Sequence, residues 1–296
     1  MNDMNKENKS IGFLGLGNMG YPMARNLLKA GYKLNVCDVN RDPVSMLENE
    51  GASGVESPLG IAETSDVLIT MLPEPSVIER VYLGEEGILK GARQGLVIID
   101  SSTTSPDLIR SIGEKAKGAG AKVLDAPVVG APPIAAAGKL IFLAGGEKEL
   151  VESCRDIFLT LGEEIIYCGP TGSGQKMKLT NNLMNGMYTL ALIEGFSLAM
   201  QNDIDLEVLK RLLSRNWPRI LDNTFNKINE QDFAPGFKLN LFNKDLKLAL
   251  KMGRISNSAL PFSSLVREMF QIAINSGCGE LSYISLLSLY EKKRHL

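Results

Sequence analysis

The chain has 296 residues, of which 44% are hydrophobic and 22% charged, and its formal net charge is −2 at pH 7. These values predict a soluble globular protein of one large or two medium domains. The balanced charge argues against nucleic acid or an anionic membrane as a partner, and no apolar run is long enough to cross a bilayer. Residues 1–9 are polar, so we expect a disordered or extended tail rather than a signal peptide.

Cysteine and histidine restrict the chemistry. The four cysteines, Cys37, Cys154, Cys168 and Cys278, are widely spaced and form no CxxC pair. We therefore expect reduced thiols in a cytoplasmic protein and no metal site. The single histidine, His295, lies next to the C-terminus, where a frayed end is a poor place for a general acid or base. Any proton-transfer group must be another residue type.

The most informative segment is 10–38. An apolar run (11–14) is followed by a glycine-rich turn, a helical pattern and a second apolar run that ends on Asp38. Strand, turn, helix, strand and acid in this order predict a dinucleotide-binding unit. The residues of the turn that we expect to bind the cofactor are Gly15, Leu16, Gly17, Asn18, Met19 and Gly20.

Each residue type in this unit has a physical reason. Gly15 allows a tight turn, Gly17 lets the backbone approach a pyrophosphate, and Gly20 lets the helix pack on the strand. The helix N-terminus then faces the phosphate charge. Asp38 lies 18 residues beyond Gly20, near the spacing at which an acid reaches a ribose 2′-hydroxyl. This favours NAD over NADP, although Arg41, three residues on, could receive a 2′-phosphate.

The remaining chain divides into two parts. Up to residue 170, strand-like segments alternate with helical patterns, which predicts a doubly wound, mainly parallel sheet of the Rossmann type over 10–171. Beyond it, helical patterns predict an all-α domain over 172–296, joined by a long interdomain helix. The expected strands are 11–14, 33–38, 67–71, 96–100, 122–126, 140–144 and 164–168. The expected helices are 19–30, 43–50, 76–83, 106–118, 148–161, 174–201, 205–215, 242–257, 263–276 and 281–292.

Two polar loops follow expected strands, at the edge where ligands bind. The first loop runs from Asp100 to Pro106, and its Ser102 and Thr103 are candidates to face a ligand. The alternative is that the loop only starts a helix, with Ser105 before Pro106 as the N-cap, and both can hold together. The second, 125–133, carries a glycine and three prolines and, from its residues alone, is a stiff loop.

Lys178 and Asn182 lie one turn apart near the start of an apolar helix. Polar side chains there are costly unless they are satisfied, which makes both candidates for a site. The alternative is a solvated first turn, which suits Lys176.

Taken together, the motifs resemble the β-hydroxyacid dehydrogenase family, which includes 3-hydroxyisobutyrate dehydrogenase and tartronate semialdehyde reductase. The resemblance runs from residue 11 to about residue 255. The motifs that carry it are GLGNMG at 15–20, DSST at 100–103, DAPV at 125–128, GSGQ at 172–175 with Lys178 and Asn181-Asn182, and KDL at 244–246.

The resemblance implies hydride transfer between a nicotinamide and a small β-hydroxy acid or its semialdehyde. It implies that Lys178 is the general acid/base and that Asn182 orients the substrate. A desolvated lysine suits this role, since burial pulls its pKa toward neutrality. By the same resemblance the domain over 172–296 is expected to bind the substrate and to join the subunits of a homodimer or homotetramer. The further residues expected along the cofactor are Met71, Leu72, Pro73, Val77, Ser102, Thr103 and Lys244.

The chain departs from the family pattern after DAPV. Many members continue with serine-glycine-glycine, whereas this chain has Val129, Gly130 and Ala131, which we still expect to contact the substrate. The loss of a hydroxyl predicts a substrate other than 3-hydroxyisobutyrate or tartronate semialdehyde. Two alternatives to this function are an imine reductase, in which the lysine tends to be replaced, and a non-catalytic dinucleotide-binding scaffold. Trp217, Arg219, Phe237 and Phe242 are candidates for the pocket or, for the aromatic residues, for the core.

Overall fold

The computed structural model describes residues 9–214, 226–228, 230, 232–234 and 236–290. The chain divides into two compact units, Met1–Lys178 and Leu179–Leu296. Of the expected N-terminal tail, only Lys9 lies within the described residues.

The described part of the first unit holds nine strands in one sheet, in the order β3-β2-β1-β4-β5-β6-β8-β7 with β9 paired to β8. The pairs from β3 to β6 are parallel, as predicted, whereas β8 runs antiparallel to β6 and β7. The first six strands therefore have the doubly wound order, with its switch point between β1 and β4. The strands are β1 Ser10–Leu14, β2 Lys33–Cys37, β3 Ser53–Gly54, β4 Val67–Thr70, β5 Val97–Asp100, β6 Lys122–Asp125, β7 Val128–Val129, β8 Leu140–Gly145 and β9 Gly162–Gly169.

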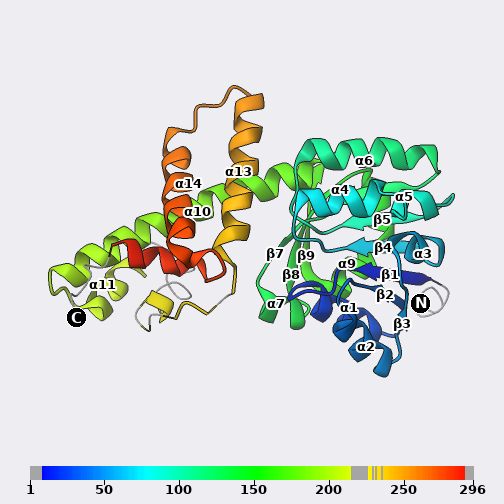
Figure 1. Ribbon diagram of the computed structural model, residues 1–296, viewed down its shortest axis with the longest axis horizontal. Helices are drawn as coiled ribbons and strands as arrows, with labels where there is room; N and C mark the ends of the chain where they lie inside the picture. Colours follow the sequence, from blue (N-terminus) through cyan, green and yellow to red (C-terminus); the bar gives the residue numbers. More distant parts are fainter. Residues whose placement is uncertain (1–8, 215–225, 229, 231, 235, 291–296) are drawn as a thin grey trace. The chain divides into compact units, whose positions relative to one another are not determined.

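Helices cover both faces of this sheet (Figure 1). Met23 and Leu27 of α1 belong to a buried cluster on one face, and Tyr82 of α4 and Ile109 of α6 belong to a cluster on the other. The expected helix 148–161 is interrupted at Cys154, and α3, α5 and α7 were not predicted. The helices are α1 Gly20–Lys29, α2 Arg41–Asn49, α3 Pro58–Glu63, α4 Pro75–Leu83, α5 Ile88–Gly91, α6 Pro106–Gly118, α7 Pro132–Ala136, α8 Lys148–Ser153 and α9 Arg155–Leu161.

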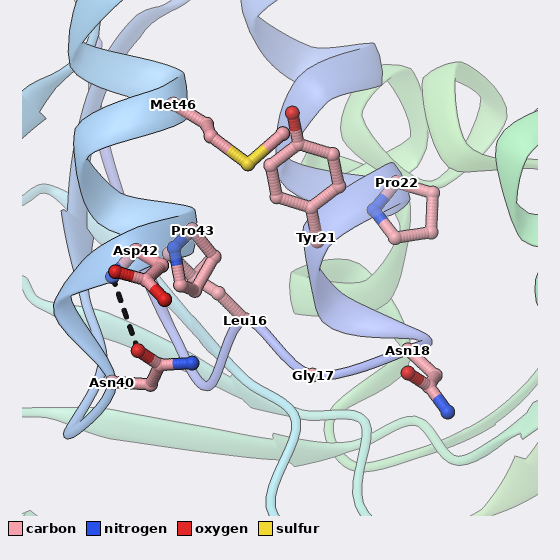
Figure 2. Close-up of a pocket in the computed structure, with 9 residues that line it drawn as sticks. All are labelled: Leu16, Gly17, Asn18, Tyr21, Pro22, Asn40, Asp42, Pro43 and Met46. Carbon is pink, nitrogen blue, oxygen red and sulfur yellow. Dashed lines mark hydrogen bonds between the residues drawn. The ribbon is translucent and has the colours of Figure 1, made fainter.

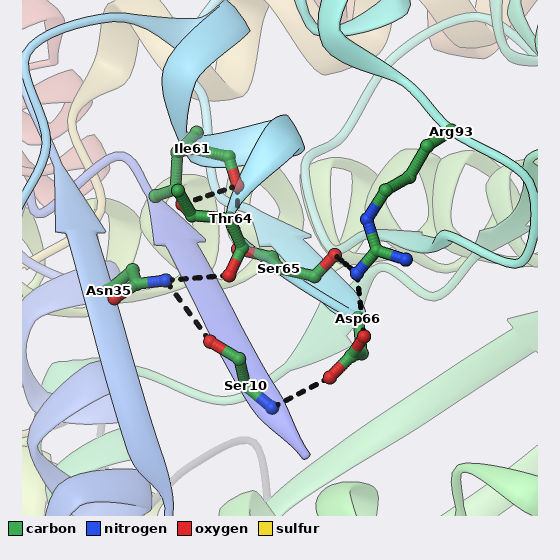
Figure 3. A network of polar contacts seen from close by, with 7 residues as sticks. All are labelled: Ser10, Asn35, Ile61, Thr64, Ser65, Asp66 and Arg93. Atoms are coloured by element: carbon green, nitrogen blue, oxygen red, sulfur yellow. Dashed lines mark hydrogen bonds and ion pairs between the residues drawn. The ribbon is translucent and has the colours of Figure 1, made fainter.

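Polar contacts fix the end of the sheet where β1 begins (Figure 3). Asp66 accepts a hydrogen bond from the Ser10 backbone at 3.0 Å and pairs with Arg93 at 2.6 Å. The Ser10 bond and Arg93 hold the pKa of the Asp66 carboxyl below its usual value. Asn35 donates to the Ser10 hydroxyl and to the Thr64 carbonyl. This network ties β1, β2 and the segment before β4 together at the end where β1 begins. The loops expected to bind a ligand follow the opposite, carboxyl ends of the strands.

The second unit is helical, as predicted. Its helix α10 (Ser173–Gln201) begins in the first unit and is followed by α11 (Leu206–Leu213), α13 (Leu239–Ile255) and α14 (Pro261–Ala273). The helix expected over 281–292 is present as a 3₁₀ helix at Tyr283–Leu289, and the chain before it bends within Ile274–Cys278, where Gly277 has φ +94°. Within the described ranges, no helix is long and apolar enough to span a membrane.

Aromatic rings fill the core of the second unit. Phe242 is 3% exposed and makes edge contacts with Phe270 and Tyr283, at ring separations of 5.1 and 5.7 Å. Phe237 packs beside it. Of the aromatic pocket candidates, Phe242 therefore belongs to the core. Trp217 and Arg219 lie outside the described residues.

Candidate functional site

The glycine-rich turn after β1 has the geometry that its spacing predicts. Gly15 has φ +98°, and a Cβ there would lie 2.3 Å from the Met71 carbonyl oxygen, while a Cβ on Gly20 would lie 1.8 Å from the Gly15 oxygen. A side chain at either position would disrupt the turn. Gly17 differs, because a Cβ there would meet no atom within 4 Å. Space is therefore open over Gly17, where a dinucleotide pyrophosphate would approach.

Helix α1 begins directly behind this turn. Met19 is its N-cap residue, and no described side chain caps the helix or places an acid in its first turn. Helix N-termini leave backbone N–H groups without intrahelical partners, and these groups favour an anion. Gly17 and Asn18 are exposed beside them. The turn therefore fits a phosphate-bearing cofactor.

Asp38 joins the end of β2 to the glycine-rich turn. One carboxylate oxygen accepts from the Leu16 backbone N–H at 2.5 Å and the other from that of Asn40 at 2.7 Å. Asn40 in turn caps α2, since its side chain accepts from the Asp42 N–H at 3.1 Å. The acid expected at the ribose thus sits beside the turn, in a loop ordered by its own side chains.

A pocket of about 470 Å³ opens between the start of α1 and the start of α2 (Figure 2). Tyr21 and Met46 face each other across its apolar side, and Asn40 and Asp42 form its polar side. The lining residues are Leu16, Gly17, Asn18, Tyr21, Pro22, Asn40, Asp42, Pro43 and Met46. Apart from the turn residues, none of these was predicted as a site residue, because a pocket between two helices leaves no local sequence pattern.

Arg41, the residue that could receive a 2′-phosphate, is paired with an acid. Its guanidinium donates to both carboxylate oxygens of Glu48, each at 3.1 Å. The pair lies over Gly54, where a Cβ would come 2.3 Å from the Glu48 carboxylate. The pocket is lined by Asp42, the next residue in the chain, and not by Arg41.

The loops after β4 and β5 lie against each other. The buried Ser102 hydroxyl accepts from the Leu72 backbone N–H at 2.9 Å, and Ser102 in turn donates its own N–H to Asp100 at 3.1 Å. Met71, Thr103 and Val77 are half-buried and Pro73 is exposed. Ser105 accepts from the Leu108 N–H, so its N-cap role is confirmed.

The first turn of α10 is fixed by buried polar groups. Asp125 accepts from the Gly172 N–H at 2.6 Å and from the Gln175 N–H at 2.9 Å. Burial raises the pKa of the Asp125 carboxyl to about 6, although these two bonds oppose the rise. Lys178 follows three residues after Gln175 and is half-buried.

Two other expected site residues, Asn182 and Lys244, both contact Asp245 in the second unit. Asn182 of α10 donates to the carboxylate of Asp245 on α13 at 2.7 Å, and Lys244 lies 3.3 Å from the other carboxylate oxygen. The side chains of Lys244 and Asp245 are 14% and 3% exposed. Asp245 therefore holds the amide of Asn182 and the ammonium of Lys244 together.

The expected substrate loop begins with the short strand β7. Val129 is half-buried, and Gly130 and Ala131 are exposed. Gly130 has φ +146°, and a Cβ there would lie 2.6 Å from the Leu140 side chain. Glycine is required at 130, whereas Ala131 is the N-cap residue of α7.

Sequence reasoning assigned no role to Asp125, Gln175 or Asp245. All three were within the quoted motifs, and all three are buried and polar. For Asp125 the signal is a charged residue between the apolar Leu124 and Ala126, because such a residue must be satisfied by a partner. Gln175 lies between Gly174 and Lys176 and carries no such signal.

Family comparisons cover both parts of the chain. Residues 10–169 match the model for the NAD-binding domain of 6-phosphogluconate dehydrogenase. Residues 172–290 match the model for the NAD-binding domain of NADP-dependent 3-hydroxyisobutyrate dehydrogenase.

Similar curated proteins extend over almost the whole chain. A 3-hydroxyisobutyrate dehydrogenase of Pseudomonas aeruginosa is 36% identical, over 96% of this chain and 99% of its own length. An NAD-dependent L-serine dehydrogenase of the same organism is 34% identical, over 96% of this chain and 98% of its own length.

Solved structures of similar fold also cover almost the whole chain. Mycobacterium tuberculosis 3-hydroxyisobutyrate dehydrogenase with L-serine superposes with a TM-score of 0.87 at 29% identity, covering 96% of this chain and 99% of that one. An imine reductase variant from Myxococcus stipitatus has a TM-score of 0.65 at 16% identity, covering 96% of this chain and all of its own, and shares the fold.

Proposed function

The chain belongs to the β-hydroxyacid dehydrogenase family and is an NAD(P)-dependent oxidoreductase of hydroxy acids; within that activity we propose that Lys178 is the general acid/base. The observation that carries the proposal is its place three residues after Gln175, in a helix start fixed by buried hydrogen bonds to Thr104 in the loop after β5 and to Asp125 at the end of β6. Lys178 takes the hydroxyl proton during oxidation and returns it during reduction. Asn182 orients the substrate.

The nicotinamide cofactor supplies hydride transfer when bound. We propose that the glycine-rich turn, Asp38 and the loops after β4 and β5 hold it, because they lie at the carboxyl edge around the switch point. The open space at Gly17 supports this assignment for the pyrophosphate. Lys244 is proposed for the nicotinamide end. The residues assigned to the cofactor are Gly15, Leu16, Gly17, Asn18, Met19, Gly20, Asp38, Met71, Leu72, Pro73, Val77, Ser102, Thr103 and Lys244.

A preference for NAD over NADP is part of the proposal. Asp38 beside the turn would repel a 2′-phosphate, and Asp42 adds a second carboxylate to the nearby pocket. Arg41 does not balance them, because its guanidinium is bonded to Glu48. The local charge therefore favours a ribose hydroxyl.

The proposed substrate is a small β-hydroxy acid or its semialdehyde, bound near Val129, Gly130 and Ala131. Without a serine hydroxyl in this loop, we infer a substrate other than 3-hydroxyisobutyrate or tartronate semialdehyde. L-Serine is the first to test, because it is a β-hydroxy acid and a relative is named for it.

The organisation of the enzyme is also proposed. Residues 10–171 form the cofactor domain, and 172–296 form the domain for substrate and for assembly into a homodimer or homotetramer. Exposed apolar side chains on α14, Phe262, Leu265 and Ile272, support an assembly surface. A cytoplasmic location is supported by four free cysteines, three of them buried.

A substrate panel tests this function. L-Serine, 3-hydroxyisobutyrate, other 2- and 3-hydroxy acids and the corresponding semialdehydes are offered with each cofactor, and NADH or NADPH absorbance is followed. We expect turnover with a β-hydroxy acid and NAD. Turnover confined to cyclic imines with NADPH would contradict the proposal, and high kcat/KM with 3-hydroxyisobutyrate would contradict its substrate part alone.

A further inference from the structure

A buried amide joins the start of α10 to the loop after β5. The Gln175 side chain donates from Nε2 to the Ser102 carbonyl oxygen at 2.8 Å and accepts at Oε1 from the Thr104 N–H at 2.9 Å. It is 0% exposed. Because both ends of the amide are used, and a flipped amide would place donor against donor, the side chain has one satisfied orientation.

The same helical turn is held from two more strands. Asp125 at the end of β6 accepts from the backbone N–H groups of Gly172 and Gln175. Gly174 lies against β8, where a Cβ would come 2.1 Å from the Leu143 carbonyl oxygen. Rotation or translation of this turn would break several buried contacts together.

The loop that Gln175 contacts is itself connected to the β4 loop. Ser102 accepts from the Leu72 N–H and donates to Asp100, which also accepts from Thr70 at 2.9 Å. The amide of Gln175 therefore joins α10 to a rigid edge and not to an isolated loop. That edge carries Leu72, Ser102 and Thr103, the residues assigned to the cofactor.

Lys178 lies three residues after Gln175, one turn further along α10 and on a neighbouring face. We propose that Gln175 is a positioning residue, which sets the placement of the Lys178 amine relative to the loop at 102–104. The inference rests on the proposed role of Lys178. Reacting groups tolerate little misplacement, since an error of about 1 Å can lower a rate on the order of 100-fold.

The test is a double-mutant cycle of Gln175→Leu and Lys178→Ala. Gln175→Leu keeps the approximate size of the side chain and removes both hydrogen bonds. In the otherwise native enzyme we expect kcat to fall by about 10- to 100-fold, while KM and the Kd of NADH change less than about threefold. In the Lys178→Ala background the same substitution should lower kcat by less than about twofold, because it acts through the missing amine.

Gln201→Leu is the matched control, since it makes the same change near the far end of the same helix, where Gln201 bonds to Ser197 and Tyr290. It should leave kcat unchanged. If Gln175→Leu does not fold, Gln175→Glu replaces it in the cycle, and the same changes in kcat, KM and the Kd of NADH are expected. Its carboxylate still accepts from the Thr104 N–H and loses only the bond to the Ser102 carbonyl.

The outcomes separate this inference from the proposed function. Full turnover of Lys178→Ala would overturn the function itself. If Lys178→Ala is impaired but Gln175→Leu keeps its kcat, or lowers it equally in both backgrounds, Gln175 has only a structural role and the inference fails.

Discussion

Asn182 of α10 and Asp245 of α13 are joined by a 2.7 Å hydrogen bond between the side chains of two residues that are 4% and 2% exposed. The bond uses one carboxylate oxygen and leaves the other to Lys244. Three side chains from two separate sequence motifs, Asn182 from one and Lys244 and Asp245 from the other, therefore form one largely buried polar group in the second unit.

Asp245→Ala should destabilise the protein by about 3 kcal/mol, because it leaves the buried amide of Asn182 without its acceptor and removes the ion pair with Lys244. Urea unfolding followed by circular dichroism measures this loss. Glu280→Ala, which removes an exposed ion pair with Lys238 in the same unit, should leave the midpoint nearly unchanged. Equal midpoints for the two variants would mean that the buried group contributes nothing to stability.

Gly17→Ala should weaken NADH binding by on the order of tenfold or more, because the new methyl group enters the space kept for the pyrophosphate. Its unfolding temperature should not change, since a Cβ there meets no protein atom within 4 Å. Fluorescence titration and thermal unfolding measure the two effects.

Gly20→Ala is the contrasting variant, and it should lower the unfolding temperature because its Cβ would overlap the Gly15 carbonyl. Unaltered NADH affinity in a folded Gly17→Ala protein would place the cofactor elsewhere.

Asp38→Asn should reduce the preference for NAD over NADP by about tenfold, because it removes a charge, while its single amide oxygen keeps one of the two bonds from the loop N–H groups. Kd values for both cofactors give the ratio. Asp42→Asn, on the pocket wall, should have a smaller effect. A ratio unchanged in Asp38→Asn would show that the acid does not contact the ribose.

Asp125 should make stability depend on pH. Its pKa is raised from 3.8 to about 6 in the folded protein, so the folded state binds this proton more tightly than the unfolded chain. Its contribution to stability is complete below about pH 4 and is lost as the pH rises through about 6, a change of about 3 kcal/mol.

Asp125→Asn should remove this part of the pH dependence, which urea unfolding between about pH 4 and pH 8 measures. Asp107→Asn, an exposed acid on α6, should keep the native slope. An identical slope in Asp125→Asn and the native protein would assign the pH dependence to other groups.

Much of the fold could be predicted because its elements have local signatures. All seven expected strands are present, since strands of this kind appear as short apolar runs between turns. The strands β3 and β7 were missed because two residues carry no periodicity. The break at Cys154 was missed because the apolar pattern continues across it.

The site was less accessible to sequence reasoning. The glycine-rich turn and Asp38 act within one short segment, so their spacing is informative. The bonds of Gln175 to Thr104 and of Asn182 to Asp245 join residues 71 and 63 positions apart. No local pattern encodes such pairs, and only the fold shows which polar groups satisfy each other.

The central claim is that the Lys178 amine transfers the proton. The most direct measurement is kcat of Lys178→Ala beside the Kd of NADH, with Lys176→Ala, an exposed lysine on the same helix, as control. We predict that Lys178→Ala lowers kcat by ~10²–10⁴-fold with nearly unchanged NADH affinity, and that Lys176→Ala does neither. Near-native turnover of Lys178→Ala would contradict the account.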